Sequence, residues 1–171
     1  MPSHTKNIAL MGIMLGLIIV ITTLEHIFVV PFMPPHVKPG FANIVIMFCV
    51  FGIGRRQAFT LNMLKSLFVL ITRGAIGGLL SLSGGLLSIA VIILLASVKK
   101  KQASYIGISV TGALFHNLGQ FIIFMLLMAT PALIYYAPML VVSGVISGVI
   151  TGILLKVLMP ALKRFHIGGL L

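Results

Sequence analysis

The chain has 171 residues, of which 60% are hydrophobic, and it carries twelve Lys and Arg against a single carboxylate, Glu25. A soluble domain of this length needs acidic as well as basic groups on its surface, so the composition indicates a membrane protein. One carboxylate supplies neither the clustered oxygens that Mg²⁺-dependent phosphoryl or prenyl transfer uses nor a paired acid and base. We therefore expect a non-enzyme with no catalytic residues, no metal and no cofactor.

Six apolar segments follow one another along the chain, and a membrane-crossing helix needs about 20 such residues. The segments are residues 7–30, 39–54, 57–73, 75–98, 104–128 and 132–159. The second and third are short for a crossing, which leaves tilting, local bilayer thinning or a half-buried loop open. We predict an all-α polytopic membrane protein, with six transmembrane helices in one integral membrane domain of residues 1–171.

The basic residues lie between the apolar segments and do not form a patch interleaved with aromatic residues, so we expect no nucleic-acid partner. With six crossings, only Lys38 and Arg73 fall on one side, and Lys65 lies within a segment. The positive-inside rule then predicts a multi-pass protein of the cytoplasmic membrane with both termini in the cytoplasm. The nine cationic residues on the cytoplasmic side are Lys6, Arg55, Arg56, Lys99, Lys100, Lys101, Lys156, Lys163 and Arg164.

The first apolar segment carries small residues on one stripe and polar residues at its outer end. Small residues at this spacing let another helix approach closely in lipid, so Ala9, Gly12 and Gly16 are candidates for docking a partner. Glu25 lies near the end of the segment, before a proline-rich stretch at 31–40. That stretch is either a connector that pairs Glu25 with Lys38 or a lid over an outward-facing pocket, and both interpretations remain open.

The third segment contains Lys65 near its middle, with Asn62 and Arg73 within roughly one helix face. A charge at that depth costs about 2.5–3.5 kcal/mol on insertion scales and usually faces a cavity or a partner. Lys65 could instead extend to the interface or form an ion pair with Glu25. We favour a functional site, because one neutralised cation does not explain a whole polar face.

The remaining segments add glycine and further polar groups. Repeated Gly and Ser across 74–88 permit either tight helix crossing or an irregular segment that lines a cavity. His116, Asn117 and Gln120 bring strong hydrogen-bonding groups into the fifth segment, where they are costly unless satisfied. Most of the Gly and Ser repeat at 143–152 is best interpreted as internal packing, and docking of a membrane partner by part of it remains open. We predict a substrate site for a small, anionic ligand, lined by Lys38, Asn43, Asn62, Lys65, Arg73, His116, Asn117 and Gln120, with Glu25 as a counter-charge.

Several segments together resemble the Gx transporter family, which is widely labelled heptaprenyl diphosphate synthase component I. That family groups with the substrate-binding S components of energy-coupling-factor (ECF) vitamin transporters. The resemblance covers nearly the whole chain and rests on residues 37–45, on Ser83-Gly84-Gly85 with Ser88, on Gly112-Ala113, His116-Asn117 and Gly119-Gln120, and on Tyr136-Ala137-Pro138. The chain differs in having Gly12 and Gly16 where S components typically have an Ala pair, and Lys65 where an Arg is expected.

The resemblance implies an S-component-like bundle of six helices that binds a vitamin-, flavin- or quinone/isoprenoid-like compound. By analogy, an ECF coupling subunit with two ATPases would supply energy for transport. The alternative takes the family label literally and makes the chain a non-catalytic membrane subunit associated with heptaprenyl diphosphate synthesis for menaquinone.

Overall fold

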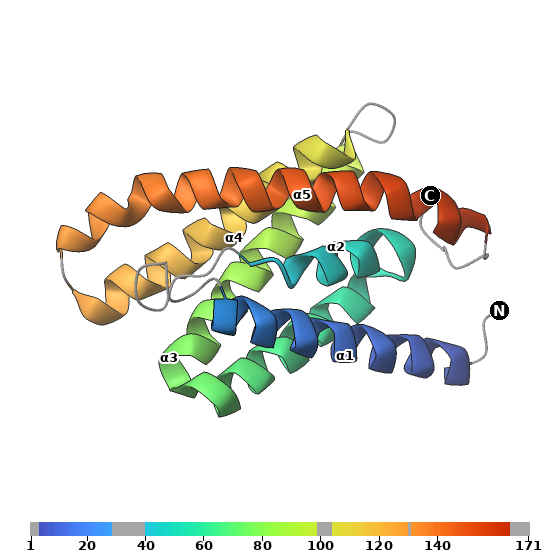
Figure 1. Ribbon diagram of the computed structural model, residues 1–171, viewed down its shortest axis with the longest axis horizontal. Coiled ribbons are helices and arrows are strands. Elements are labelled where there is room, and N and C mark those ends of the chain that lie inside the picture. The colour runs from blue at the N-terminus through green and yellow to red at the C-terminus, as the bar shows by residue number, and fades with distance from the viewer. Residues whose placement is uncertain (1–3, 29–39, 99–103, 130, 165–171) are drawn as a thin grey trace.

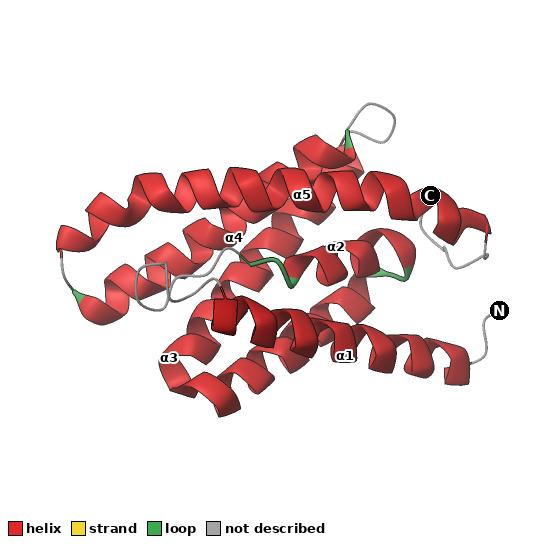
Figure 2. Ribbon diagram, in the orientation of Figure 1, coloured by secondary structure: helices red, strands yellow, loops and turns green. Residues whose placement is uncertain are grey.

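The computed structural model describes residues 4–28, 40–98, 104–129 and 131–164, and every regular element among them is helical (Figures 1 and 2). The all-α class predicted from the sequence is confirmed for this part of the chain. The elements are α1 (His4–Phe28), α2 (Asn43–Gly52), α3 (Arg55–Val98), α4 (Tyr105–Met128), the 3₁₀ helix η2 (Pro131–Tyr136) and α5 (Ala137–Arg164).

Four helices in the described ranges are long and apolar enough to cross a membrane, within Ile8–Phe28, Arg55–Ser97, Tyr105–Met128 and Ile134–Pro160. Large apolar side chains remain exposed on them, for example Ile71 at 73% and Leu126 at 72%. Such surfaces suit hydrocarbon as a solvent, so the chain is a membrane protein. The six crossings predicted from the sequence are therefore not confirmed as six separate membrane-length helices. The second predicted segment forms the ten-residue α2, and the third and fourth are joined in α3.

Helix α3 is a hairpin of two helical halves and not one straight rod (Figure 1). Gly74 has φ +80° and ψ 178°, a conformation that L side chains rarely adopt, and it reverses the chain between the halves. Ser66 Oγ donates to Ser81 Oγ at 3.5 Å across the hairpin. Near its open end, Arg55 Nη2 donates to Ser97 Oγ at 3.3 Å. The predicted boundary between residues 73 and 75 therefore coincides with a real reversal of direction.

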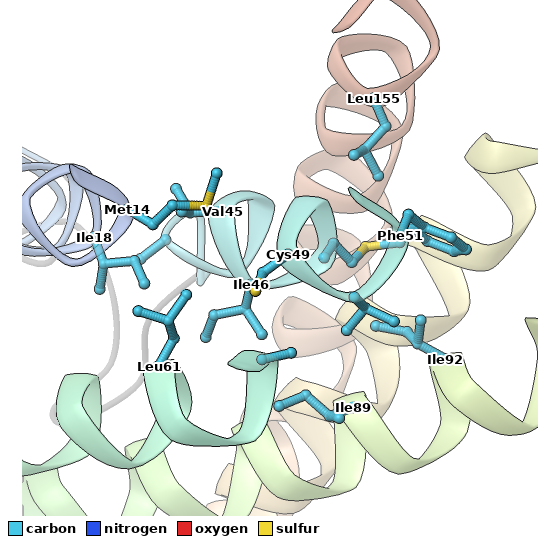
Figure 3. Close-up of a cluster of buried hydrophobic side chains, with 14 of the residues drawn as sticks. Met14, Ile18, Val45, Ile46, Cys49, Phe51, Leu61, Ile89, Ile92 and Leu155 are labelled. Atoms are coloured by element: carbon cyan, nitrogen blue, oxygen red, sulfur yellow. The ribbon is translucent and has the colours of Figure 1, made fainter. Parts of the chain in front are cut away.

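Helix α2 lies inside the bundle, between α1, α3 and α5 (Figures 1 and 3). Its residues from Val45 to Gly52 are buried except Phe48, and Cys49 is fully enclosed. Met14 and Ile18 of α1, Ile89 and Ile92 of α3, and Leu155 of α5 belong to the same apolar cluster. The body of α2 is thus fixed by packing on all sides. This packing holds Asn43, at the N-terminal end of α2, next to Lys65.

Helix α1 contacts the bundle along one narrow stripe. Met14, Ile18, Thr22 and Glu25 are buried at spacings of three and four residues, which is one face of a helix. The small-residue stripe predicted for partner docking, Ala9, Gly12 and Gly16, is exposed on the opposite face. A Cβ at Gly12 or Gly16 would meet nothing within 4 Å, so this face is open to another helix.

Helices α4 and α5 approach closely along the Gly and Ser repeat, as internal packing requires. A Cβ on Gly148 would lie 2.5 Å from Val110 Cα, and one on Gly152 would lie 2.5 Å from Ile106 Cα. Gly144 allows Asn117 to reach the α5 backbone, because a Cβ there would lie 3.0 Å from Asn117 Nδ2. The repeat therefore serves helix packing in lipid, where van der Waals contact drives association.

We expect Gly148→Ala to destabilise the protein by about 1–3 kcal/mol, because the new methyl group meets backbone that cannot move aside easily. Gly107→Ala is the matched control on α4, since nothing lies within 4 Å of a Cβ there. Detergent-titrated unfolding followed by circular dichroism measures both. Equal stabilities of the two variants would contradict the close α4–α5 approach.

Candidate functional site

A small, partly open cavity with polar and apolar lining lies between α1, the two halves of α3, α4 and the turn that leads into α2. Its volume is about 20 Å³. That is room for little more than one water-sized group, whereas drug-sized ligands occupy about 300–1,000 Å³. The residues that line it are Thr22, Glu25, Gly40, Lys65, Val69, Gly77, Leu80, Ser81, His116 and Gln120.

Lys65 is the cation of this cavity and is only 4% exposed. It comes from the middle of the first half of α3, where the helix faces α1 and α2. Its Nζ donates to Asn43 Oδ1 at 2.8 Å, a neutral acceptor at the start of α2. Within the described residues, no carboxylate oxygen lies within 4.0 Å of this ammonium group. Lys65 is therefore buried without a direct ion pair there.

Glu25 holds the turn at the start of α2. Its Oε1 accepts hydrogen bonds from the backbone N–H of Gly40 at 2.6 Å and of Phe41 at 3.2 Å. The sequence suggested Lys38 or Lys65 as an ion-pair partner of Glu25. Lys38 lies outside the described residues, so that pairing stays a prediction. An ion pair between Glu25 and Lys65 is not formed. Glu25 acts on Lys65 only at longer range, while its direct partners are backbone amides.

His116 fills the space between two glycines. A Cβ on Gly40 would lie 2.9 Å from its Cδ2, and a Cβ on Gly84 would lie 2.9 Å from its Cε1. Gly40 also has φ +78°, so both its backbone and its neighbour favour the absence of a side chain. His116 is 1% exposed, and its Nδ1 makes no well-formed hydrogen bond among the described residues, although the Gly84 backbone lies near the ring.

Arg73 adds a second cation just before the reversal at Gly74. Its Nη2 donates to the backbone carbonyl of Thr22 at 2.5 Å. Its Nη1 is buried and has no partner in the described part of the chain. The Thr22 hydroxyl is likewise buried without a partner, and Thr22 lines the cavity. Two polar groups near the cavity thus keep unused hydrogen-bonding capacity.

Asn62 and Asn117 are buried, but they do not line the cavity. Asn62 packs against Gly85 in the other half of α3, where a Cβ would overlap its amide. Asn117 Nδ2 donates to Leu140 O at 2.8 Å and to Ser143 Oγ at 3.2 Å. The Asn117 side chain therefore links α4 to α5 by hydrogen bonds, whereas we predicted from the sequence that it would bind a ligand together with His116.

The structure brings together Glu25, Lys65, His116 and Gln120 from the predicted set. Asn43 accepts a hydrogen bond from Lys65, and Arg73 donates one to Thr22, which also lines the cavity. Lys38 lies outside the described residues. Whether any of them binds a ligand stays a prediction. Sequence reasoning did not include Thr22 and Ser81 in the site. Thr22 is three residues before Glu25 on the same helix face, which is a signal that could have found it.

Charged groups of both signs lie at or near the cavity, and the positive ones outnumber the negative one. Lys65 and Arg73 carry two positive charges near it, and Glu25 is the only carboxylate in the sequence. Thr22, Ser81 and Gln120 add hydroxyl and amide groups to its lining. In a low-dielectric interior such donors and cations attract an anion strongly. Together, the fold and the cavity define a helical membrane protein with a small cavity that is lined by buried charged and polar groups.

The profile of the heptaprenyl diphosphate synthase component I family matches residues 14–158, which is most of the chain. The chain therefore belongs to this family. The match agrees with the label under which the resemblance was drawn from the sequence. No curated protein and no solved structure gives a significant match.

We expect Glu25 and Lys65 to be energetically coupled through their charges, although they do not touch. Glu25→Gln alone should lower the free energy of unfolding by about 1–3 kcal/mol, because Gly40 and Phe41 lose a charged acceptor and Lys65 loses its compensation. Lys65→Met should cost less in the Glu25→Gln background than in the wild type, with a coupling energy of about 0.5–3 kcal/mol.

A double-mutant cycle of unfolding free energies measures this coupling. Lys156→Met, at an exposed lysine on α5, is the control and should be additive with Glu25→Gln. Additive effects of Glu25→Gln and Lys65→Met would show that the two charges do not sense each other.

Proposed function

We propose that this chain is a non-catalytic, membrane-embedded subunit of a heptaprenyl diphosphate synthase. The observation that carries the proposal is the family match over residues 14–158 in a chain with four membrane-length helices. A component I requires a partner subunit, and that partner would carry out the prenyl transfer. The use of Glu25 as an acceptor for backbone amides fits this division of work, because it leaves the chain's single carboxylate in a structural role.

The cavity supports a role in holding an anionic compound for the partner. Prenyl diphosphates combine a charged head with an apolar tail, and a cationic cavity among apolar helices offers a complement to both. Lys65 would bind the anionic head, with Arg73 Nη1 and the Thr22 hydroxyl as further donors. A quinone- or flavin-like anion would use the same groups.

We expect the turn at residues 40–43 to move when such a compound enters. The cavity of about 20 Å³ is too small for an organic ligand, and the lining residues other than Gly40 belong to long helices. Hydrogen bonds from Gly40 N to Glu25 Oε1 and from Lys65 Nζ to Asn43 Oδ1 hold the turn against the bundle. The N-cap residue of α2, Ala42, makes no side-chain hydrogen bond to the first turn of the helix. An anionic oxygen on Lys65 would replace Asn43 Oδ1 there.

We also propose six passes through the bilayer with both termini in the cytoplasm. A helix of 43 residues would be about 65 Å long, twice the hydrocarbon thickness, so the two halves of α3 would count as separate passes. Successive helical segments alternate in direction in Figure 1, so that α1 begins at the end of the bundle where α5 ends. The ten-residue α2 would then be a short pass shielded by the surrounding helices.

Transport in the manner of an ECF S component is the second candidate. The exposed stripe of Ala9, Gly12 and Gly16 favours it, because an open small-residue face is suited to docking a membrane coupling subunit. The same stripe would serve a synthase partner equally well. The two functions differ in what docks: a prenyl synthase in one, a coupling subunit with two ATPases in the other.

Affinity purification of the tagged chain from native membranes tests the function. A prenyl synthase subunit should co-purify, and its elongation of farnesyl diphosphate should fall several-fold when this chain is removed. Gly16→Leu should reduce the co-purified partner several-fold without unfolding the chain, because the exposed stripe would no longer be smooth. Gly107→Leu is the control, another exposed helical glycine with nothing near its Cβ. Recovery of ATPases without a prenyl synthase would instead support transport.

Binding of farnesyl diphosphate to the purified chain tests the site. Lys65→Met should weaken binding by about tenfold or more, because the side chain keeps its volume and loses its charge. Lys156→Met removes an exposed lysine and should bind like the wild type. Farnesol, which has the tail without the charge, should bind weakly to all three proteins. Unchanged binding by Lys65→Met would remove Lys65 from the ligand site.

A further inference from the structure

The burial of Lys65 leaves an electrostatic problem that its protein contacts do not solve. Lys65 is 4% exposed, and its ammonium group donates its hydrogen bond to the neutral Oδ1 of Asn43. Buried charges in proteins are normally paired. Within the described residues, no carboxylate oxygen comes within 4.0 Å of Lys65 Nζ, and Glu25 Oε1 is engaged by Gly40 and Phe41. A counter-ion is therefore missing at short range.

The cavity beside Lys65 has the size and lining of a site for such a counter-ion. Its volume of about 20 Å³ admits one small ion or water and excludes an organic molecule. Thr22, at 2% exposed, lines it and keeps a buried hydroxyl without a partner among the described residues. His116, Gln120 and Ser81 add further groups able to donate hydrogen bonds to an anion.

The charges around the cavity favour an anion over a cation. Lys65 lines the cavity and Arg73 lies behind Thr22, whereas Glu25 is the single negative group. Glu25 lines the cavity too, but one of its oxygens is turned to the amides of Gly40 and Phe41. These three groups together carry an excess of positive charge, which a monovalent anion would neutralise.

We propose that the cavity binds a single monatomic anion of the size of chloride, held by Lys65 and the Thr22 hydroxyl. The ion neutralises the buried ammonium group while the turn at residues 40–43 is in place. A larger organic anion has to displace it in order to reach Lys65. The inference rests on the cavity and its charges and does not require the synthase role.

Thermal unfolding of the purified chain in detergent tests the site, with chloride replaced by gluconate at constant ionic strength. Gluconate is too large for the cavity, so only chloride should stabilise the folded state. The wild-type melting temperature should rise by about 3–6 °C at a chloride concentration about ten times the dissociation constant. Lys156→Met should keep this rise, and Lys65→Met should lose it.

Thr22→Val removes the unpartnered hydroxyl at nearly constant volume, and it should weaken chloride binding several-fold even if Lys65→Met does not fold. A crystal grown in bromide gives an independent readout on the wild type, with an anomalous peak expected beside Lys65 and Thr22. Equal melting temperatures in chloride and gluconate, or no bromide peak in the cavity, would mean that it holds water only. If both the chloride site and the prenyl diphosphate site exist, farnesyl diphosphate should bind more weakly as the chloride concentration rises. If chloride binds but no prenyl synthase co-purifies, only the proposed synthase function is rejected.

Discussion

The burial of one ammonium group among apolar helices is the constraint on which the site depends. Lys65 sits where a charge is costly, so the groups around it are arranged to reduce that cost. Asn43 supplies a direct acceptor, and Glu25 supplies a negative charge at longer range while it holds the turn before α2. The same residues that make Lys65 tolerable thus connect α1, α2 and α3 at the cavity.

Glycine makes this arrangement sterically feasible. Gly40 and Gly84 leave the space that the His116 imidazole occupies, and Gly85 leaves the space for Asn62. Gly74 reverses the chain so that both halves of α3 line the cavity, while the second half packs against α4. In lipid, where apolar surfaces gain little by leaving the solvent, such close contacts are the main source of helix association. The glycines therefore serve the fold and the site at once.

Much of the fold could be predicted because hydropathy and charge are local properties. The helical class, the membrane environment and the boundary at Gly74 followed from apolar runs and from glycine. The site was predictable only in part, since burial of a polar residue says that it needs a partner and not which one. Asn117 illustrates this, because its amide binds the α5 backbone at Leu140 and does not reach the cavity.

The sequence by itself determined that this chain lies in a membrane, that its polar residues are few, and that Lys65 requires compensation at depth. Only the tertiary structure decided which groups supply it, because the partners come from helices far apart in the chain. It placed Glu25 on the amides of Gly40 and Phe41, and it left a cavity of about 20 Å³ beside Lys65. Contacts between distant segments depend on crossing positions that are set by packing, and hydropathy does not encode them.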